Sequence, residues 1–107
     1  MPNYNVMGVA KAALEASVKY LSVDLGDQNV RVNAISAGPM RTLSGAGIKN
    51  AREVLKYSQT NSPLKRSVEL DELGNTAVYL VSDLSSAVTG EILYVDCGYN
   101  IVGMPSI

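Results

Sequence analysis

Histidine is absent from the 107 residues, and cysteine occurs once, at position 97. The lack of histidine removes the commonest general base and the commonest metal ligand, so no metal site is predicted. Any chemistry must rest on tyrosine, lysine, hydroxyl or carboxylate side chains. A single cysteine excludes an internal disulfide, which suits a reducing compartment such as the cytoplasm.

Long apolar runs and an excess of either charge are also missing. No stretch approaches 18 apolar residues, and no charged N-terminal segment precedes an apolar core, so neither a membrane span nor a secretory signal is predicted. Nine basic and ten acidic side chains leave a net charge of −1, which speaks against nucleic acid as a partner. The hydrophobic content of 47% is typical of a globular protein.

Periodicity predicts an α/β fold. Apolar residues at three- and four-residue steps indicate a helix over residues 4–27 and another over 70–84. Two β-rich segments predict strands at 30–36 and 91–96, separated by a loop with a short helix over 38–60. A strand, a helical crossover and a second strand form a parallel pair.

Two strands are too few for an independent parallel sheet, because such sheets are normally covered on both faces. The predicted strand containing Val30–Ile35 would also keep an unpaired edge. We therefore expect the C-terminal part of a larger doubly wound, Rossmann-like sheet, which needs further chain or a partner.

Tyr4 and Lys11 begin the first predicted helix and are seven residues apart. Seven residues are about two turns at roughly 3.6 residues per turn, so both side chains lie on nearly the same face. A phenol beside an ammonium group is able to stabilise or protonate an enolate oxygen without histidine. The alternative is a helix start with a solvated lysine.

Several segments, in order and at matching separations, resemble the enoyl-[acyl-carrier-protein] reductases of the short-chain dehydrogenase/reductase superfamily. They are Tyr4–Ala12, Arg31–Thr42, Ser82–Ser85, Val88–Glu91 and Val95–Gly98, and the resemblance spans essentially all 107 residues. Most of the superfamily would carry the tyrosine at position 7, which is Met7 here. The wider spacing from Tyr4 to Lys11 is that of the enoyl reductase branch.

This resemblance implies NADH-dependent reduction of the C2=C3 double bond of trans-2-enoyl thioesters carried on acyl-carrier protein. Tyr4 and Lys11 would be catalytic, with Tyr4 bonding the thioester carbonyl and Lys11 holding the nicotinamide ribose. The implied cofactor contacts are Lys11, Met40, Arg41, Thr42, Leu43 and Ser44. The implied acyl pocket consists of Tyr4, Met7, Ser44, Ile48, Ala51 and Val54.

Several of these residues also have a purely structural interpretation. The Gly38-Pro39 pair and the residues after it would also suit an ordinary turn, and Ile48 and Val54 would suit a helix core. Cys97, without an evident cationic neighbour, is expected to be a packing residue. The carboxylates at 69, 71 and 72 are expected to complement a helix dipole.

The family resemblance also implies an N-terminal half with the glycine-rich turn that binds pyrophosphate, and no such turn occurs in this sequence. We therefore expect the 107 residues alone to be inactive and Met1 to be an internal methionine. The resemblance implies homotetramers as well. The alternatives are a different short-chain reductase, against which Met7 speaks, and a non-catalytic association module.

Overall fold

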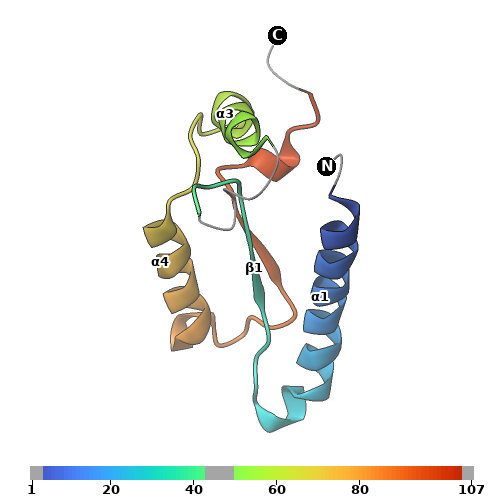
Figure 1. The fold of residues 1–107 in the computed structure, drawn as a ribbon. Helices are drawn as coiled ribbons and strands as arrows, with labels where there is room; N and C mark the ends of the chain where they lie inside the picture. Colours follow the sequence, from blue (N-terminus) through green and yellow to red (C-terminus); the bar gives the residue numbers. More distant parts are fainter. Residues whose placement is uncertain (1–3, 43–49, 105–107) are drawn as a thin grey trace. The chain divides into compact units, whose positions relative to one another are not determined.

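The computed structural model describes residues 4–42 and 50–104. Along the chain, helix α1 covers Asn5–Asp24, strand β1 Ala34–Ala37, helix α3 Ala51–Asn61, helix α4 Leu70–Val81 and strand β2 Ile92–Val95 (Figure 1). Short 3-10 turns follow α1, α4 and β2, and they are η1 (Gly26–Gln28), η2 (Asp83–Ser85) and η3 (Tyr99–Ile101).

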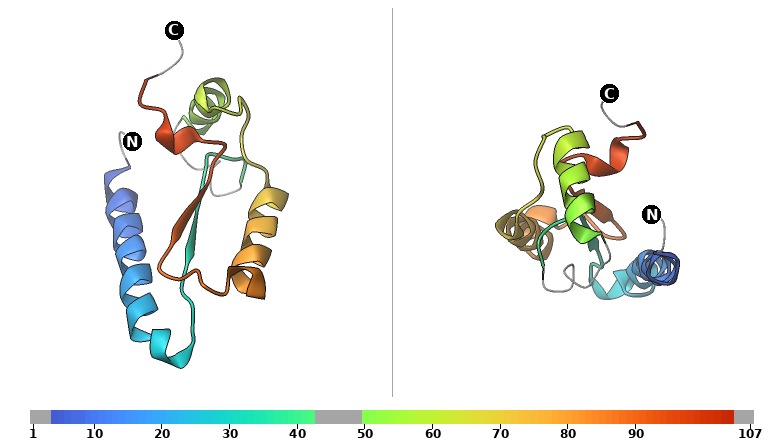
Figure 2. Two further views of the ribbon diagram at one scale, coloured as in Figure 1. Left: turned by 180° about the vertical axis from the view of Figure 1, so that it is seen from behind. Right: turned by 45° about the horizontal axis from the view of Figure 1, so that its top comes forward.

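The two strands pair in parallel. The Gly90 N–H donates to the Val32 carbonyl at 2.7 Å, and the Ala34 N–H donates to the Glu91 carbonyl at 2.9 Å. The Gly38 N–H donates to the Val95 carbonyl at 3.0 Å. Residue numbers rise together on both strands, as in a parallel ladder, and β1 and β2 run side by side in both views of Figure 2. The predicted α/β class is confirmed.

The first strand starts later than the sequence suggested. Residues 30–36 were expected, whereas β1 covers Ala34–Ala37. Besides the Val32 carbonyl, which accepts the Gly90 N–H, the preceding residues use side-chain hydrogen bonds. The Val32 N–H donates to Thr89 Oγ1, and Asn33 Nδ2 donates to the Val88 carbonyl. Periodicity identifies extended residues, but it does not reveal which of them find a backbone ladder.

The helix ends also differ from the sequence expectation. Helix α1 stops at Asp24 and continues as η1, where residues 4–27 were expected as one helix. Helix α4 stops at Val81, because Ser82 is extended at φ −97° and ψ 169° before η2 begins. The last strand, expected over 91–96, is Ile92–Val95.

The described part of the chain forms two compact units. The first contains the residues up to Ala34 together with Tyr79–Leu93, and the second contains Ile35–Val78 together with the residues from Tyr94 onward. In the first unit, a Cβ on Gly90 would lie 2.9 Å from Ser22 Oγ, so α1 approaches the turn before β2 closely. In the second, the rings of Tyr57 on α3 and Tyr99 on η3 meet edge to face at 6.2 Å.

Few apolar side chains are buried. Val18, Val68 and Leu80 are the buried hydrophobic residues among those described. Helix α1 instead exposes a series of large apolar side chains, among them Val6, Val9, Leu14, Tyr20 and Val23. Such exposure agrees with the expectation that these residues pack against further protein. No helix in the described ranges is long and apolar enough to cross a membrane.

Candidate functional site

The candidate catalytic pair belongs to α1 in the first unit. Tyr4 directly precedes the helix, and its carbonyl accepts a hydrogen bond from the Gly8 N–H at 2.6 Å. Its half-buried ring lies along the first turn, because a Cβ on Gly8 would be 3.9 Å from Tyr4 Cδ1. The helix therefore holds the phenol at its N-terminal end.

Lys11 follows Gly8 by three positions, so it lies on the face of α1 along which the Tyr4 ring runs. Its side chain is exposed. Met7 is also on this side, three positions after Tyr4 and four before Lys11, and it is 47% exposed.

The second unit contains a separate groove of about 1380 Å³. Three predicted cofactor contacts line it directly after β1: Met40, which is half-buried, and the exposed Arg41 and Thr42. Of the predicted acyl-pocket residues, Ala51 lines the same groove. Val54 is half-buried on α3 but is not a lining residue.

Three predicted site residues, Leu43, Ser44 and Ile48, lie outside the described residues. The remaining groove walls were not identified from the sequence. They are Arg52, Leu55, Lys56 and Gln59 on α3 and residues 66–71 before and at the start of α4. On α3, positions 51, 55 and 59, and likewise 52 and 56, are four residues apart. This spacing in the sequence indicates residues that share a helix face.

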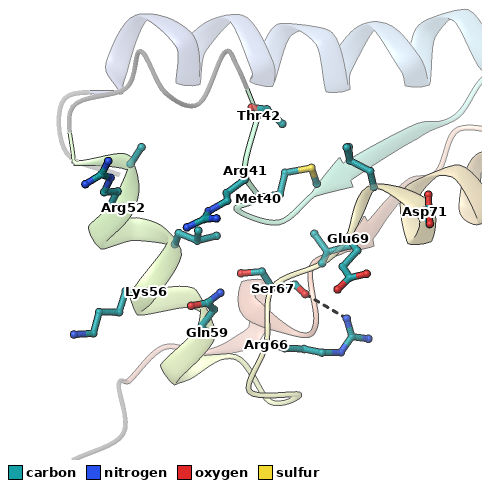
Figure 3. Close-up of a pocket in the computed structure, with 14 residues that line it drawn as sticks. Met40, Arg41, Thr42, Arg52, Lys56, Gln59, Arg66, Ser67, Glu69 and Asp71 are labelled. Atoms are coloured by element: carbon teal, nitrogen blue, oxygen red, sulfur yellow. Dashed lines mark hydrogen bonds between the residues drawn. The ribbon is translucent and has the colours of Figure 1, made fainter.

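Figure 3 shows the groove in close-up, with Arg41 directed toward α3 and the segment 66–71 on the opposite wall. The Ser67 hydroxyl is buried and has no hydrogen-bond partner among the described residues. Burial of a hydroxyl without a hydrogen-bond partner costs free energy, so the Ser67 hydroxyl on this wall is an unsatisfied polar group. The groove thus combines cationic, apolar and hydroxyl groups.

A bidentate ion pair orders the wall before α4. Arg66 Nη2 lies 2.6 Å from Glu72 Oε1, and Arg66 Nη1 donates to Glu72 Oε2 at 2.8 Å. Glu72 Oε2 also accepts the Glu69 N–H at 2.9 Å, which caps the helix start. The Arg66 bonds, and then the Glu69 N–H, lower the pKa of Glu72 from 4.5 to about 2. Among the three carboxylates, Glu72 therefore has a structural role, as a helix cap and ion-pair partner.

Cys97 has a cationic neighbour, contrary to expectation. The hydrogen bonds to Glu72 raise the pKa of Arg66 first, and the electrostatic interaction with Cys97 raises it further. Both residues line a small cavity of about 280 Å³. The sequence did not reveal this proximity, because Arg66 and Cys97 are 31 positions apart. Within the described ranges, no group of three or more His, Cys, Asp or Glu side chains is arranged to hold a metal ion.

The chain is similar in sequence to known proteins. A family model described as enoyl-(acyl carrier protein) reductase matches residues 1–100. The NADH enoyl-[acyl-carrier-protein] reductase 2 of Rhizobium meliloti is 65% identical over the whole chain, which covers 40% of that relative's length.

Solved structures give the same result. FabI of Candidatus Liberibacter asiaticus matches 99% of the chain with 63% identity and a TM-score of 0.94, and the chain covers 41% of it. The Anaplasma phagocytophilum reductase in complex with NAD matches with 60% identity and a TM-score of 0.92, again over 41% of its length. These similarities confirm the Rossmann-like fold and the predicted resemblance, and the chain belongs to the enoyl-(acyl carrier protein) reductase family.

Proposed function

We propose that this chain is part of an enoyl-[acyl-carrier-protein] reductase that reduces the C2=C3 double bond of trans-2-enoyl thioesters with NADH in fatty-acid synthesis. The observation that carries the proposal is the Tyr4–Lys11 pair on one face of α1. It stands in a family whose relatives are named NADH reductases. The reaction would take place in the cytoplasm.

Tyr4 would donate a hydrogen bond to the thioester carbonyl oxygen. This bond gains most when negative charge develops on that oxygen, because a preorganised donor stabilises an enolate more than a neutral carbonyl. Helix α1 preorganises the phenol, since the backbone of Tyr4 is bonded to Gly8 and its ring lies against the first turn. Lys11 would bind the ribose hydroxyls of the nicotinamide nucleotide and add positive charge. The hydride for C3 would come from bound NADH.

The described residues fit a nicotinamide nucleotide. In Rossmann-like sheets, ligands bind beyond the carboxyl ends of the strands, and Met40, Arg41 and Thr42 line a groove directly after β1. The buried Ser67 hydroxyl of this groove lacks a protein partner among the described residues and suits a polar ligand atom. Met40, Arg41 and Thr42 would hold the cofactor together with Lys11. Leu43 and Ser44 remain predicted contacts.

The acyl chain would lie against apolar side chains. Met7 is partly exposed on α1, and Ala51 and Val54 are half-buried on α3. Together with Tyr4 they would form the substrate pocket, and Ser44 and Ile48 are further predicted members. A flexible thioether such as that of Met7 adapts to chains of different shape.

The chain spans about 40% of the length of the curated relatives it matches. We propose that catalysis requires the remaining part of the reductase and that the assembled protein is a homo-oligomer, a tetramer by family resemblance. The exposed apolar side chains of α1 support this proposal, because isolated folded proteins rarely leave so many large apolar groups in water.

A hybrid reductase provides the test. In it, this chain replaces the matching region of the Rhizobium meliloti relative and is thereby joined to the other 60% of that relative. We expect the hybrid to oxidise NADH with a short trans-2-enoyl thioester and this chain alone to show no turnover.

A third sample would mix this chain with the separate N-terminal part of the relative. Activity in the hybrid or the mixture supports the reductase function. A folded, associated hybrid without activity would contradict it and leave an association module as the better account. Reduction of a ketone in place of the enoyl thioester would indicate a different short-chain reductase.

A further inference from the structure

The turn after β2 touches both ends of the segment that carries the proposed contacts. This turn, Asp96–Asn100, follows the last strand directly. The segment starts at Gly38, where β1 ends, and returns at Pro63 and Leu64, after α3. All of these residues belong to the second unit.

At the start of the segment, the contact is exceptionally close. A Cβ on Gly38 would lie 2.7 Å from Asp96 Cβ and 2.8 Å from Asp96 Cα. The Gly38 N–H also donates to the Val95 carbonyl at 3.0 Å. Glycine is required here because the opposing atoms are backbone or attached directly to it. The backbone that leads into Met40 is thereby held against Asp96.

At the far end, the same turn meets the exit from α3. The Leu64 N–H donates to the Cys97 carbonyl at 3.3 Å. A Cβ on Gly98 would lie 2.7 Å from Pro63 Cγ, in a rigid ring, and Gly98 has a left-handed φ of +83°. The contact between Tyr57 and Tyr99 adds a third link to α3.

The Asp96 carboxylate holds the turn together. Its side chain is 7% exposed. Oδ1 accepts the Gly98 N–H at 2.9 Å, and Oδ2 accepts the Asn100 N–H at 2.8 Å and Asn100 Nδ2 at 3.0 Å. A carboxylate with three such donors fixes the left-handed conformations of Cys97 and Gly98, at φ 57° and 83°.

We propose that Asp96 is a positioning residue for the reductase: it locks the 96–100 turn, which clamps both ends of the segment 38–64. The proposal rests on the proposed function, because Met40, Arg41 and Thr42 at one end and Ala51 and Val54 toward the other are the contacts that the clamp would place. Asp96 itself acts through this backbone and does not touch the substrate.

The kinetic test compares Asp96→Asn, Gly38→Ala and the control Gly26→Ala in the hybrid reductase. Asparagine has the size of aspartate, but its amide N–H group would face an N–H donor that the Asp96 carboxylate accepts. The added methyl of Gly38→Ala meets Asp96, whereas nothing lies within 4 Å of a Cβ on Gly26. We expect kcat/KM for NADH to fall about ten- to hundredfold in the first two variants, mainly through KM, and to stay unchanged in the control.

A purely structural role would lower the unfolding midpoint but leave KM for NADH unchanged at temperatures where the variant is folded, and that result would overturn the proposal. If Gly38→Ala does not fold, the KM for NADH of Asp96→Asn alone tests the proposal.

Amide hydrogen exchange separates this inference from the proposed function. We expect faster exchange at Met40–Thr42 and at the amides of Ser62 and Leu64 in Asp96→Asn. Should the unmodified hybrid show no activity, the reductase function fails while exchange still tests the clamp. Unchanged exchange at both ends would overturn the clamp.

Discussion

At the scale of single residues, the strongest prediction concerns the Tyr4 hydroxyl. Tyr4→Phe in the hybrid reductase removes the donor to the enolate oxygen but keeps the ring beside Gly8. We expect kcat to fall on the order of 10²- to 10³-fold, as when one oxyanion donor is lost. Steady-state NADH oxidation measures it.

Tyr20→Phe is the matched control, because Tyr20 is on the same helix and 73% exposed. Full activity of Tyr4→Phe would remove Tyr4 from the catalytic role.

The lowered pKa of Glu72 predicts that the stability of the fold depends on pH. Its pKa falls from 4.5 to about 2 in the folded chain, through the Arg66 bonds and then the Glu69 N–H. A depressed carboxylate pKa stabilises the fold above the unfolded value, and this contribution is lost as pH falls from 4.5 toward 2. Glu72→Gln should therefore lower the midpoint of thermal unfolding at pH 7. The difference in midpoint between this variant and the unmodified hybrid should become smaller below pH 4.5.

The Arg66 and Glu72 side chains are 48% and 37% exposed, so the effect is expected to be small and reduced by salt. A gap between the two midpoints that stays constant across this pH range would contradict the assignment.

At the scale of elements, Arg31 joins three segments of the first unit. Its Nη2 donates to the Leu80 carbonyl at 2.8 Å and to the Ser82 carbonyl at 3.2 Å, where α4 ends. Its Nη1 donates to Ser85 Oγ at 3.0 Å and to the Val88 carbonyl at 3.1 Å. A cation that binds the last carbonyls of a helix also complements the helix dipole.

Arg31→Met keeps most of the side-chain length but leaves these acceptors without a donor. We expect a loss of about 2–4 kcal/mol in stability, read as a lower midpoint in thermal unfolding of the hybrid reductase. Lys19→Met, an exposed cation on α1, should have little effect. Equal midpoints for the two variants would refute the role of Arg31.

At the scale of the whole molecule, the apolar surface of α1 bears on assembly. Val9 and Val23 are 73% and 78% exposed. If α1 packs against another subunit, Val9→Asn and Val23→Asn should each weaken self-association of the hybrid, at roughly 1.5 kcal/mol or about tenfold in Kd. Sedimentation equilibrium measures this, with Gln28→Asn as an exposed polar control. Unchanged association in both valine variants would exclude these positions from a subunit contact.

The sequence by itself determined the family, the α/β class and the order of elements. These properties follow from local order: the Tyr4–Lys11 spacing places two side chains on one helix face, and apolar periods distinguish helices from strands. It also excluded a disulfide within these 107 residues, because they contain a single cysteine. Strand and helix ends were less exact, because partners distant in the sequence decide them, as Thr89 and Val88 do for residues 32 and 33.

Only the tertiary structure decided which distant residues meet. Arg66 lies near Cys97, Gly38 packs against Asp96, and Arg31 binds the end of α4. The residues of each pair are 31 to 58 positions apart in the sequence. The same holds for the wall of the groove at 66–71, which no local pattern marked. Periodicity reports the environment of a side chain along its own element, whereas contacts of this kind depend on how the chain returns after each crossover.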